Sequence, residues 1–243
     1  MSDYRKRIYD TYASARRQPY VPDTLEDLKP RRPYLKRLIR DTFPHDRNSA
    51  ILDLGCGWGG LIHLARQEGY QNIRGVDRSE EQVAAAKNLS IDGVERGDAI
   101  EALAKEKIAA IDCLVTFDLI EHFNRNELIS LVDEAHRVLN DNGCWIIHTP
   151  NAESPFGMRI RYGDLTHELA FTQSSLSQLL LSSGFSIVDC YEDQPIPHGV
   201  KSTIRFFLWK VIRRLLFSYI IIETGDTDSD AIFSQNFLAV AYK

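Results

Sequence analysis

The sequence predicts an α/β fold in which a doubly wound, mostly parallel sheet is covered by helices on both faces. Strand-like and helix-like segments alternate, and each strand-like run ends at a glycine or a polar residue. The run at 111–117 is almost entirely apolar, as expected of a central parallel strand. A cluster of glycines at Gly55, Gly57 and Gly60 directly follows the first strand-like run and opens a helical segment. Such a turn lets a ligand approach the backbone closely.

Five strands are predicted in the first part of the chain, at 50–54, 73–76, 94–96, 111–117 and 144–148. Helices are expected at 34–39, 58–68, 79–89 and 125–139. Ser79 is a favourable N-cap, and the acidic residues that follow it suit the positive end of the helix dipole. Ligands in such sheets bind beyond the carboxyl ends of the strands. The residues at those ends are Gly55, Asp77, Asp98, Asp118 and 148–151.

The last part of the chain contains a long loop and an insertion. About 20 residues after Pro150 show no clear period, and a loop of this length is usually functional. A helix at 174–183 and a strand at 185–191 follow, and the last strand at 236–242 would pair with the latter. Between these two strands, apolar residues recur at helical spacing from 204 to 219. Basic residues interrupt this stripe, which argues against a membrane-spanning helix.

Composition indicates one folded domain of 243 residues. We divide it into an N-terminal helical and basic extension (1–48), a core (49–192), an insertion (193–235) and a last strand (236–243). The net charge of −5 argues against nucleic acid as a partner. The four cysteines lack metal-ligand spacing, and we recognise no export leader at the N-terminus. Both features predict a cytoplasmic protein with reduced thiols.

The residues around the glycine turn indicate which nucleotide it holds. Gly55, Gly57 and Gly60 match the dinucleotide fingerprint, with Asp77 where a ribose-binding acid should be. However, Asp53 would repel a pyrophosphate and suits a cationic ligand instead. Asp98, after the third strand, could accept a hydrogen bond from an adenine amino group. S-adenosylmethionine has a cationic sulfonium, an amino acid head, a ribose and an adenine but no phosphate, so it fits this set.

Four segments at 53–59, 75–79, 97–99 and 117–123 resemble, in order and spacing, the motifs of class I S-adenosylmethionine-dependent methyltransferases. The resemblance covers roughly residues 33–190. It implies a Rossmann-like, seven-stranded sheet with an antiparallel last strand. By motif, it places Asp53, Gly55 and Gly57 at the methionine part of the cofactor. It also places Asp77 at the ribose, Arg78, Asp98 and Ala99 at the adenine, and Phe117 near the methyl donor.

A narrower resemblance concerns the acceptor. The stretches at 148–157, 162–172 and 198–202, with Arg205 and Trp209, resemble methyltransferases of bacterial surface-polysaccharide biosynthesis. This implies a sugar hydroxyl as acceptor, on a surface glycan or its lipid-linked precursor. Two alternatives remain: the hydroxyl of a small molecule such as a quinone or polyketide, with the apolar insertion forming its pocket, or a non-catalytic module that only binds the cofactor. His198, Lys201 and Arg205 could bind an acidic sugar or a phosphate.

Transfer to a hydroxyl benefits from a general base, because a sugar hydroxyl is a poor nucleophile at neutral pH. His167, in the long loop between Asp164 and Glu168, is the first candidate, and His148 at the end of the fifth strand is the second. The alternative role for His167 is to pin the loop by hydrogen bonds.

A metal ion is a second way to activate the hydroxyl. Asp118-x-x-Glu121-His122 resembles the acid-x-x-Glu-His of some metal-dependent O-methyltransferases, with His167 as a fourth ligand. A Mg²⁺-type ion there could lower the pKa of the acceptor hydroxyl. Alternatively, the two acids cap a turn and His122 packs.

Two segments outside the core leave alternatives open. The insertion helix could pack against the sheet, or residues 203–219 could meet anionic lipid at the inner face of a membrane. The tyrosines and arginines of the N-terminal extension could form a lid over the cofactor or a mobile basic arm. The sequence leaves the oligomeric state open.

Overall fold

The computed structural model describes residues 3–11, 14–15, 21–227 and 230–243. Its centre is a seven-stranded sheet with the order β3-β2-β1-β4-β5-β7-β6. The strands are β1 (Ile51–Leu54), β2 (Ile73–Asp77), β3 (Val94–Arg96), β4 (Ile111–Phe117), β5 (Leu139–Pro150), β6 (Ile187–Glu192) and β7 (Asn236–Tyr242). Strand β7 runs antiparallel to both β5 and β6, whereas the other pairs are parallel. The predicted sheet, including its antiparallel last strand, is confirmed.

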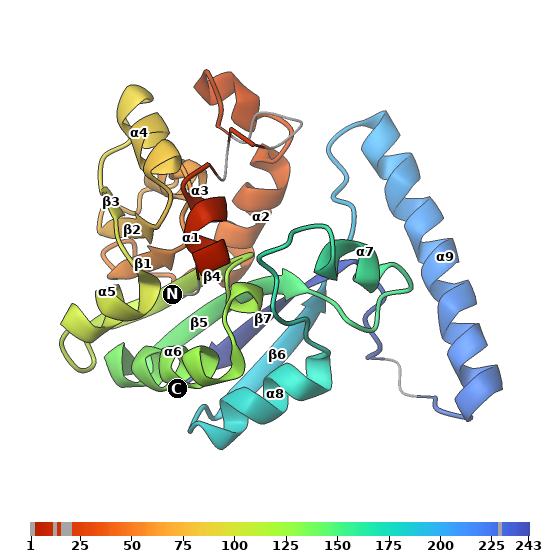
Figure 1. Ribbon diagram of the computed structural model, residues 1–243. Helices are drawn as coiled ribbons and strands as arrows, with labels where there is room; N and C mark the ends of the chain where they lie inside the picture. The colour runs from red at the N-terminus through yellow and green to blue at the C-terminus, as the bar shows by residue number, and fades with distance from the viewer. Residues whose placement is uncertain (1–2, 12–13, 16–20, 228–229) are drawn as a thin grey trace.

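Helices cover both faces of this sheet (Figure 1). They are α1 (Asp3–Tyr9), α2 (Arg32–Thr42), α3 (Gly60–Gln67), α4 (Glu80–Asn88), α5 (Ala99–Lys105), α6 (Arg125–Val138), α7 (Gly157–Arg161), α8 (Gln173–Ser182) and α9 (Val200–Thr224), with 3₁₀ turns η1 (Leu25–Leu28) and η2 (Ile120–His122). Neighbouring strand residues point to opposite faces. Leu52 packs into a core shared with α5, α6 and α8, and Ile51 packs into one shared with α2, α3 and α4.

Helix α5 and strand β5 are among the elements that differ from the sequence prediction. Helix α5 was not predicted; Asp98 caps it by accepting hydrogen bonds from the backbone N–H groups of Ile100 (2.9 Å) and Glu101 (3.3 Å). An acid followed three residues later by glutamate is a recognised signal for a helix start. Strand β5 begins at Leu139, whereas the sequence predicted that the strand begins at 144. Leu139 pairs with Ile111, and the pairing shifts register before Cys144 meets Cys113.

Helix α9 is longer and less buried than the apolar stripe indicated. It is continuous over 25 residues, and Ser202 is its buried residue. Figure 1 shows it standing at the edge of the molecule, away from the sheet. The alternative in which this stripe packs against the sheet is therefore wrong. No helix among the described residues combines the length and the apolar composition that crossing a membrane requires.

The N-terminal extension is tied to the core through α1. The buried Arg5 guanidinium pairs with the carboxylates of Glu127 (2.7 Å) and Glu168 (3.0 Å), and the Tyr4 hydroxyl also bonds to Glu168. These contacts hold α1 across the carboxyl edge of the sheet, which favours the lid over the mobile arm. Tyr12 and Tyr20, which belong to the same hypothesis, lie outside the described residues.

Candidate active site

One cavity of about 790 Å³ opens at the carboxyl ends of the central strands. It contains every residue predicted to bind the cofactor: Asp53, Gly55, Gly57, Asp77, Arg78, Asp98, Ala99 and Phe117. The same cavity reaches His167 of the long loop, and Arg5 and Tyr9 of the N-terminal extension line it as well. The residues of the cofactor motifs and the long loop after Pro150 therefore line one continuous cavity.

Backbone geometry at the glycine turn creates the cofactor end of this cavity. Gly55 and Gly57 have φ angles of +71° and +56°, a left-handed conformation that glycine adopts without strain. The N–H of Gly57 donates to one oxygen of Asp77, and the N–H of Ser79 donates to the other, each at 2.8 Å. Asp77 thus locks the turn after β1 to the start of α4. Burial raises its pKa, against the effect of these two hydrogen bonds.

Asp53 lies below this turn and is only 2% exposed. Its Oδ1 atom is buried and has no hydrogen-bond partner among the described residues. Burial and the neighbouring Asp77 raise the pKa of Asp53 well above its usual range. A buried acceptor without a partner is unfavourable, and the ammonium group of a bound amino acid would satisfy it. The residues present therefore fit the methionine part of S-adenosylmethionine.

Sequence reasoning missed two polar residues of this cavity. Gln82 is buried on α4 and lines the cavity, and neither polar atom of its amide has a partner among the described residues. Asn236, at the start of β7, also lines the cavity and has an unpartnered Oδ1. Glutamine and asparagine carry no motif of their own here, so only their place in the fold identifies them. Both are available for hydrogen bonds to a ligand.

At the side predicted to hold the adenine, Arg78 pairs with Asp98 at 3.4 Å, and its guanidinium lies 5.5 Å from the ring centre of Tyr9. Asp98 therefore serves two purposes, because its other oxygen caps α5. Tyr9 belongs to α1, so the N-terminal extension contributes directly to the cavity wall beside these residues.

His148 lies behind the cavity rather than in its wall. Its Nδ1 is 2.6 Å from an oxygen of Asp118, its Nε2 is 3.5 Å from Asp193, and its ring stacks on Phe117 with centres 4.0 Å apart. Burial alone would lower the pKa of His148, but the two carboxylates raise it to about 10. An imidazolium with both N–H groups donated has no lone pair for a proton, so the geometry gives no support to His148 as a base.

Asp118 has a left-handed backbone, with φ at +55°, which is uncommon for a residue with a side chain. Its carboxylate turns to His148, and His148 keeps its pKa below the usual value although burial acts in the opposite direction. Strained backbone of this kind persists where surrounding contacts fix it. The consequence is that Asp118 separates from the two other residues of its motif.

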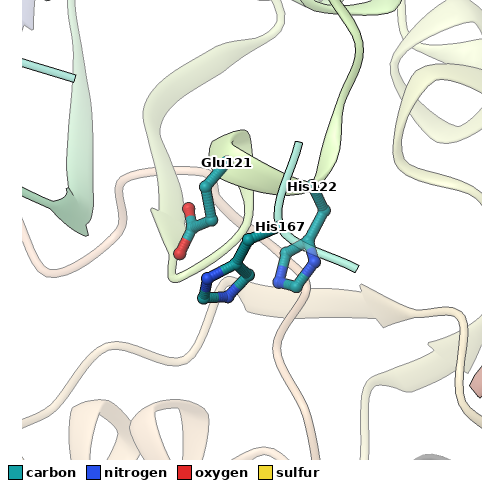
Figure 2. Close-up of side chains that lie close together, drawn as sticks. All are labelled: Glu121, His122 and His167. Atoms are coloured by element: carbon teal, nitrogen blue, oxygen red, sulfur yellow. The ribbon is translucent and has the colours of Figure 1, made fainter. Parts of the chain in front are cut away.

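Glu121, His122 and His167 form a compact cluster at the acceptor end (Figure 2). Each offers one ligand atom, and these atoms all lie within 4.8 Å of one another. Figure 2 shows the carboxylate and the two rings gathered together, from η2 on one side and the long loop on the other. The structure thus brings together three of the four predicted ligands, without Asp118.

Hydrogen bonds orient both imidazoles of the cluster. The Nδ1 of His167 lies 3.0 Å from the carbonyl oxygen of Ile160, so Nδ1 carries the proton and Nε2 keeps a lone pair. The Nδ1 of His122 lies 2.9 Å from the Thr166 hydroxyl. His167 therefore pins the loop, as one alternative held, and still presents a basic nitrogen.

Burial sets the protonation of the cluster. It lowers the pKa of His167, and together with His167 it lowers that of His122 to about 4. Burial and the charge of Asp118 raise the pKa of Glu121 to about 8. One oxygen of Glu121 accepts from the Thr149 hydroxyl at 3.2 Å, and the other is buried without a partner among the described residues. At neutral pH, the cluster therefore holds two neutral imidazoles.

The predicted substrate residues lie around a second, smaller cavity of about 250 Å³. His198 and Arg205 line it together with Asp193, but Lys201 is not part of its wall. Because Asp193 and Asp118 both face His148, this imidazole lies between the two cavities.

Comparisons with known proteins agree with this geometry. A family model described as a methyltransferase domain matches residues 28–189. Cyclopropane mycolic acid synthase 3 of Mycobacterium tuberculosis is 28% identical over 133 residues, which are 53% of this chain and 46% of that protein. The S-adenosylmethionine-dependent methyltransferase UmaA of the same organism is 26% identical over 46% of this chain and 40% of its own length. The chain therefore spans about half the length of these curated relatives.

Solved structures show the same fold. A SAM-dependent methyltransferase from Archaeoglobus fulgidus superimposes with a TM-score of 0.66 at 22% identity, over 90% of this chain and 98% of that one. A phosphoethanolamine N-methyltransferase 2 of Haemonchus contortus, in complex with S-adenosyl-L-methionine, gives 0.59 at 18% identity, over 86% of this chain and 52% of that one. The family match covers well over half of the chain, and the acidic cavity around the glycine turn fits the cofactor. The chain therefore belongs to the methyltransferase domain family.

Proposed function

We propose that this chain transfers the methyl group of S-adenosylmethionine to a hydroxyl group, specifically a sugar hydroxyl of a bacterial surface glycan or of its lipid-linked precursor. The observation that carries the proposal is the neutral His167, whose Nε2 keeps a lone pair and which lines the same cavity as the residues predicted to bind the cofactor. Transfer is an in-line displacement: the acceptor oxygen attacks the methyl carbon, and the sulfur departs with its bonding electrons. His167 takes the hydroxyl proton as the oxygen attacks.

The polar lining of the acceptor end supports a carbohydrate. Glu121, His122 and Asp164 face this part of the cavity, and Arg159 of α7 lines it as well. Carboxyl, imidazole and guanidinium groups match the alternating donors and acceptors of sugar hydroxyls. An apolar acceptor would leave the unpartnered oxygen of Glu121 without a hydrogen bond, at a cost in binding free energy.

The alternative acceptor was a quinone or polyketide held by the apolar insertion. Helix α9 contributes no described residue to the wall of the larger cavity. Its apolar side chains are exposed instead, so the support expected for that alternative is missing. Cyclopropane mycolic acid synthase 3 is named for a different compound, a cyclopropane mycolic acid, and it matches 53% of this chain. The hydroxyl proposal therefore depends on the cluster rather than on these relatives.

A divalent ion is the specific alternative to a base at the cluster. The Nδ1 atoms of His122 and His167 are held by protein groups, which leaves both Nε2 atoms and one oxygen of Glu121 for an ion. Outer hydrogen bonds of this kind orient metal-binding histidines. Two imidazoles and one carboxylate suit Mn²⁺, Fe²⁺ or Zn²⁺ better than Mg²⁺, which prefers oxygen. A bound ion would lower the pKa of the acceptor hydroxyl.

We further propose that His198 and Arg205, at the smaller cavity, bind an acidic group of the acceptor. Arg205 supplies a permanent charge and a planar donor set suited to carboxylate or phosphate. Lys201 was predicted to share this role but lies outside the wall of the smaller cavity, so it would contribute only through its charge.

The test is transfer from methyl-labelled S-adenosylmethionine to a panel of neutral sugars, acidic sugars, lipid-linked glycans, phenols and fatty acids. The proposal predicts label on a glycan, with acidic sugars preferred. Label on phenols or fatty acids alone would contradict it. The same assay after EDTA treatment, followed by addition of Mn²⁺, Zn²⁺ or Mg²⁺, decides between base and ion. Unchanged activity in EDTA would eliminate the ion.

A further inference from the structure

Helix α9 is fastened to the body of the protein along one face. The indole N–H of Trp209 donates to Glu192 at the end of β6 (3.1 Å), and Arg213 pairs with the same carboxylate (3.2 Å). Arg213 also donates to the carbonyl oxygen of Ala231 (2.9 Å). Trp209 and Arg213 are four residues apart and therefore lie on the same side of the helix. The opposite side consequently has a fixed orientation with respect to the sheet.

That opposite side is apolar and exposed to solvent. Leu208 and Leu215 are 57% and 66% exposed, and Ile222 is 84% exposed. Nine large apolar side chains of this kind occur on the helix: Val200, Ile204, Phe207, Leu208, Val211, Ile212, Leu215, Tyr219 and Ile222. Most follow one another at intervals of three or four positions and so form a stripe, which over 25 residues extends about 37 Å. A stripe of this size on a protein surface marks an interaction site.

Charge identifies what the stripe meets. Lys201 and Arg205, one turn apart, border it on one side, and Lys210 and Arg214 border it on the other. From residue 200 to residue 222 the helix has five basic residues and no acidic residue, although the chain as a whole carries −5. A second copy of this helix would bring cations against cations, which is unfavourable. The partner that complements the stripe is therefore apolar and anionic.

We propose that α9 docks the protein on an anionic lipid surface. An apolar face with basic residues at its margins is typical of helices that lie in the headgroup region of a bilayer. There the apolar side chains enter the acyl boundary, while the lysine and arginine stems extend along it and keep their charges among lipid phosphates. The inference is independent of the acceptor, and it accords with a lipid-linked one.

The experiment is co-sedimentation of the full chain with sucrose-loaded vesicles, without cofactor or acceptor. One set contains equal parts of phosphatidylglycerol and phosphatidylcholine, and the other contains phosphatidylcholine alone. We expect binding to the anionic vesicles to be at least about tenfold tighter and to weaken as salt is raised. Equal or no binding to the two sets would overturn the proposal.

Variants locate the binding on α9. Leu208→Glu combined with Leu215→Glu should weaken vesicle binding about tenfold or more, because charges replace exposed apolar groups that would enter the acyl boundary of the bilayer. Ile108→Glu is the matched control, since Ile108 is 72% exposed and lies far from α9 in sequence, between α5 and β4. Removing two cations, with Lys210→Gln and Arg214→Gln, should weaken binding to anionic vesicles roughly tenfold.

Sedimentation velocity tests the alternative that a second copy of the protein covers the stripe. If the wild type is a dimer that the two glutamates dissociate, and the vesicles remain unbound, then the stripe is a self-interface and the proposal is wrong. All variants should keep wild-type affinity for S-adenosylmethionine, since none lies at the cavity. Vesicle binding without glycan methylation would contradict the proposed acceptor and leave the docking inference standing.

Discussion

The two ends of the large cavity are built in different ways. At the cofactor end, the residues follow the ends of successive parallel strands, and the turn after β1 contributes through its backbone: it has two left-handed glycines and is locked by Asp77. At the acceptor end, side chains from segments about 45 residues apart in the chain converge, and each imidazole has its own hydrogen bond. The cofactor end therefore depends on local sequence, and the acceptor end depends on how the chain folds.

This difference predicts that substitutions at the two ends affect different quantities, cofactor affinity at one end and turnover at the other. Substitutions at the glycine turn should lower the affinity for S-adenosylmethionine. Substitutions at the cluster should leave cofactor affinity intact and slow methyl transfer. The following variants test this separation, beginning with the largest expected effect.

His167→Ala should lower kcat by about 100-fold or more, because it removes the nitrogen that accepts the acceptor proton. Affinity for S-adenosylmethionine, measured by calorimetry, should stay at the wild-type value. His63→Ala, which removes a histidine of α3 outside the cavity wall, is the control and should change neither quantity. Wild-type turnover in His167→Ala would exclude His167 as base.

Asp77→Ala should abolish measurable binding of S-adenosylmethionine, a loss of about 100-fold or more. The substitution frees the N–H groups of Gly57 and Ser79 and removes the carboxylate predicted to accept from the ribose. Asp92→Ala, which removes a carboxylate in the loop before β3, should bind normally in the same calorimeter. An unchanged affinity in Asp77→Ala would mean that the cofactor lies elsewhere.

A smaller effect is expected at Asp53, namely a release of protons when the cofactor binds. Its pKa is well above the usual value in the free protein because it is buried beside Asp77. A bound ammonium group would lower that pKa, so binding of the cofactor should release protons. Calorimetry in two buffers of different ionisation enthalpy measures this release. Asp53→Asn should abolish it, and a release that persists in the variant would have to come from another group.

The smallest effect is expected at His148, and it concerns the pH dependence of stability rather than activity. Its pKa rises from the usual 6.5 to about 10 in the folded protein, so the folded state binds the proton more tightly than the unfolded state. The stabilisation is complete below the unfolded pKa and is lost as pH rises toward about 10. Urea midpoints should therefore fall across this range, and His148→Asn should flatten the fall. An identical slope in the variant would locate the dependence elsewhere.

Much of the cofactor end was evident from the sequence. The acids at 53, 77 and 98 follow or end strands whose carboxyl ends must meet at one edge of a parallel sheet, so their convergence needed no knowledge of packing. Gly55 and Gly57 adopt the left-handed conformation that their position implied. Gln82 was missed because a buried amide is defined by what surrounds it, not by its neighbours in the chain.

The acceptor end illustrates the limit of motif spacing. Asp118, Glu121 and His122 are close in sequence, yet the left-handed backbone at Asp118 turns its carboxylate to His148 and away from the other two. His167 completes the cluster with Glu121 and His122, and it comes from a loop whose sequence has no hydrophobic period. Similarly, His148 was a candidate base until the fold placed it between two carboxylates.

By itself, then, the sequence determined the sheet, the glycine turn and the class of cofactor, because strand alternation and backbone conformation are local properties. Only the tertiary structure decided which histidine keeps a free lone pair. It also decided that the apolar stripe of α9 faces outward and that α1 covers the cavity. Those outcomes depend on burial and on contacts between distant segments, which set the pKa of a side chain and the direction in which a helix faces.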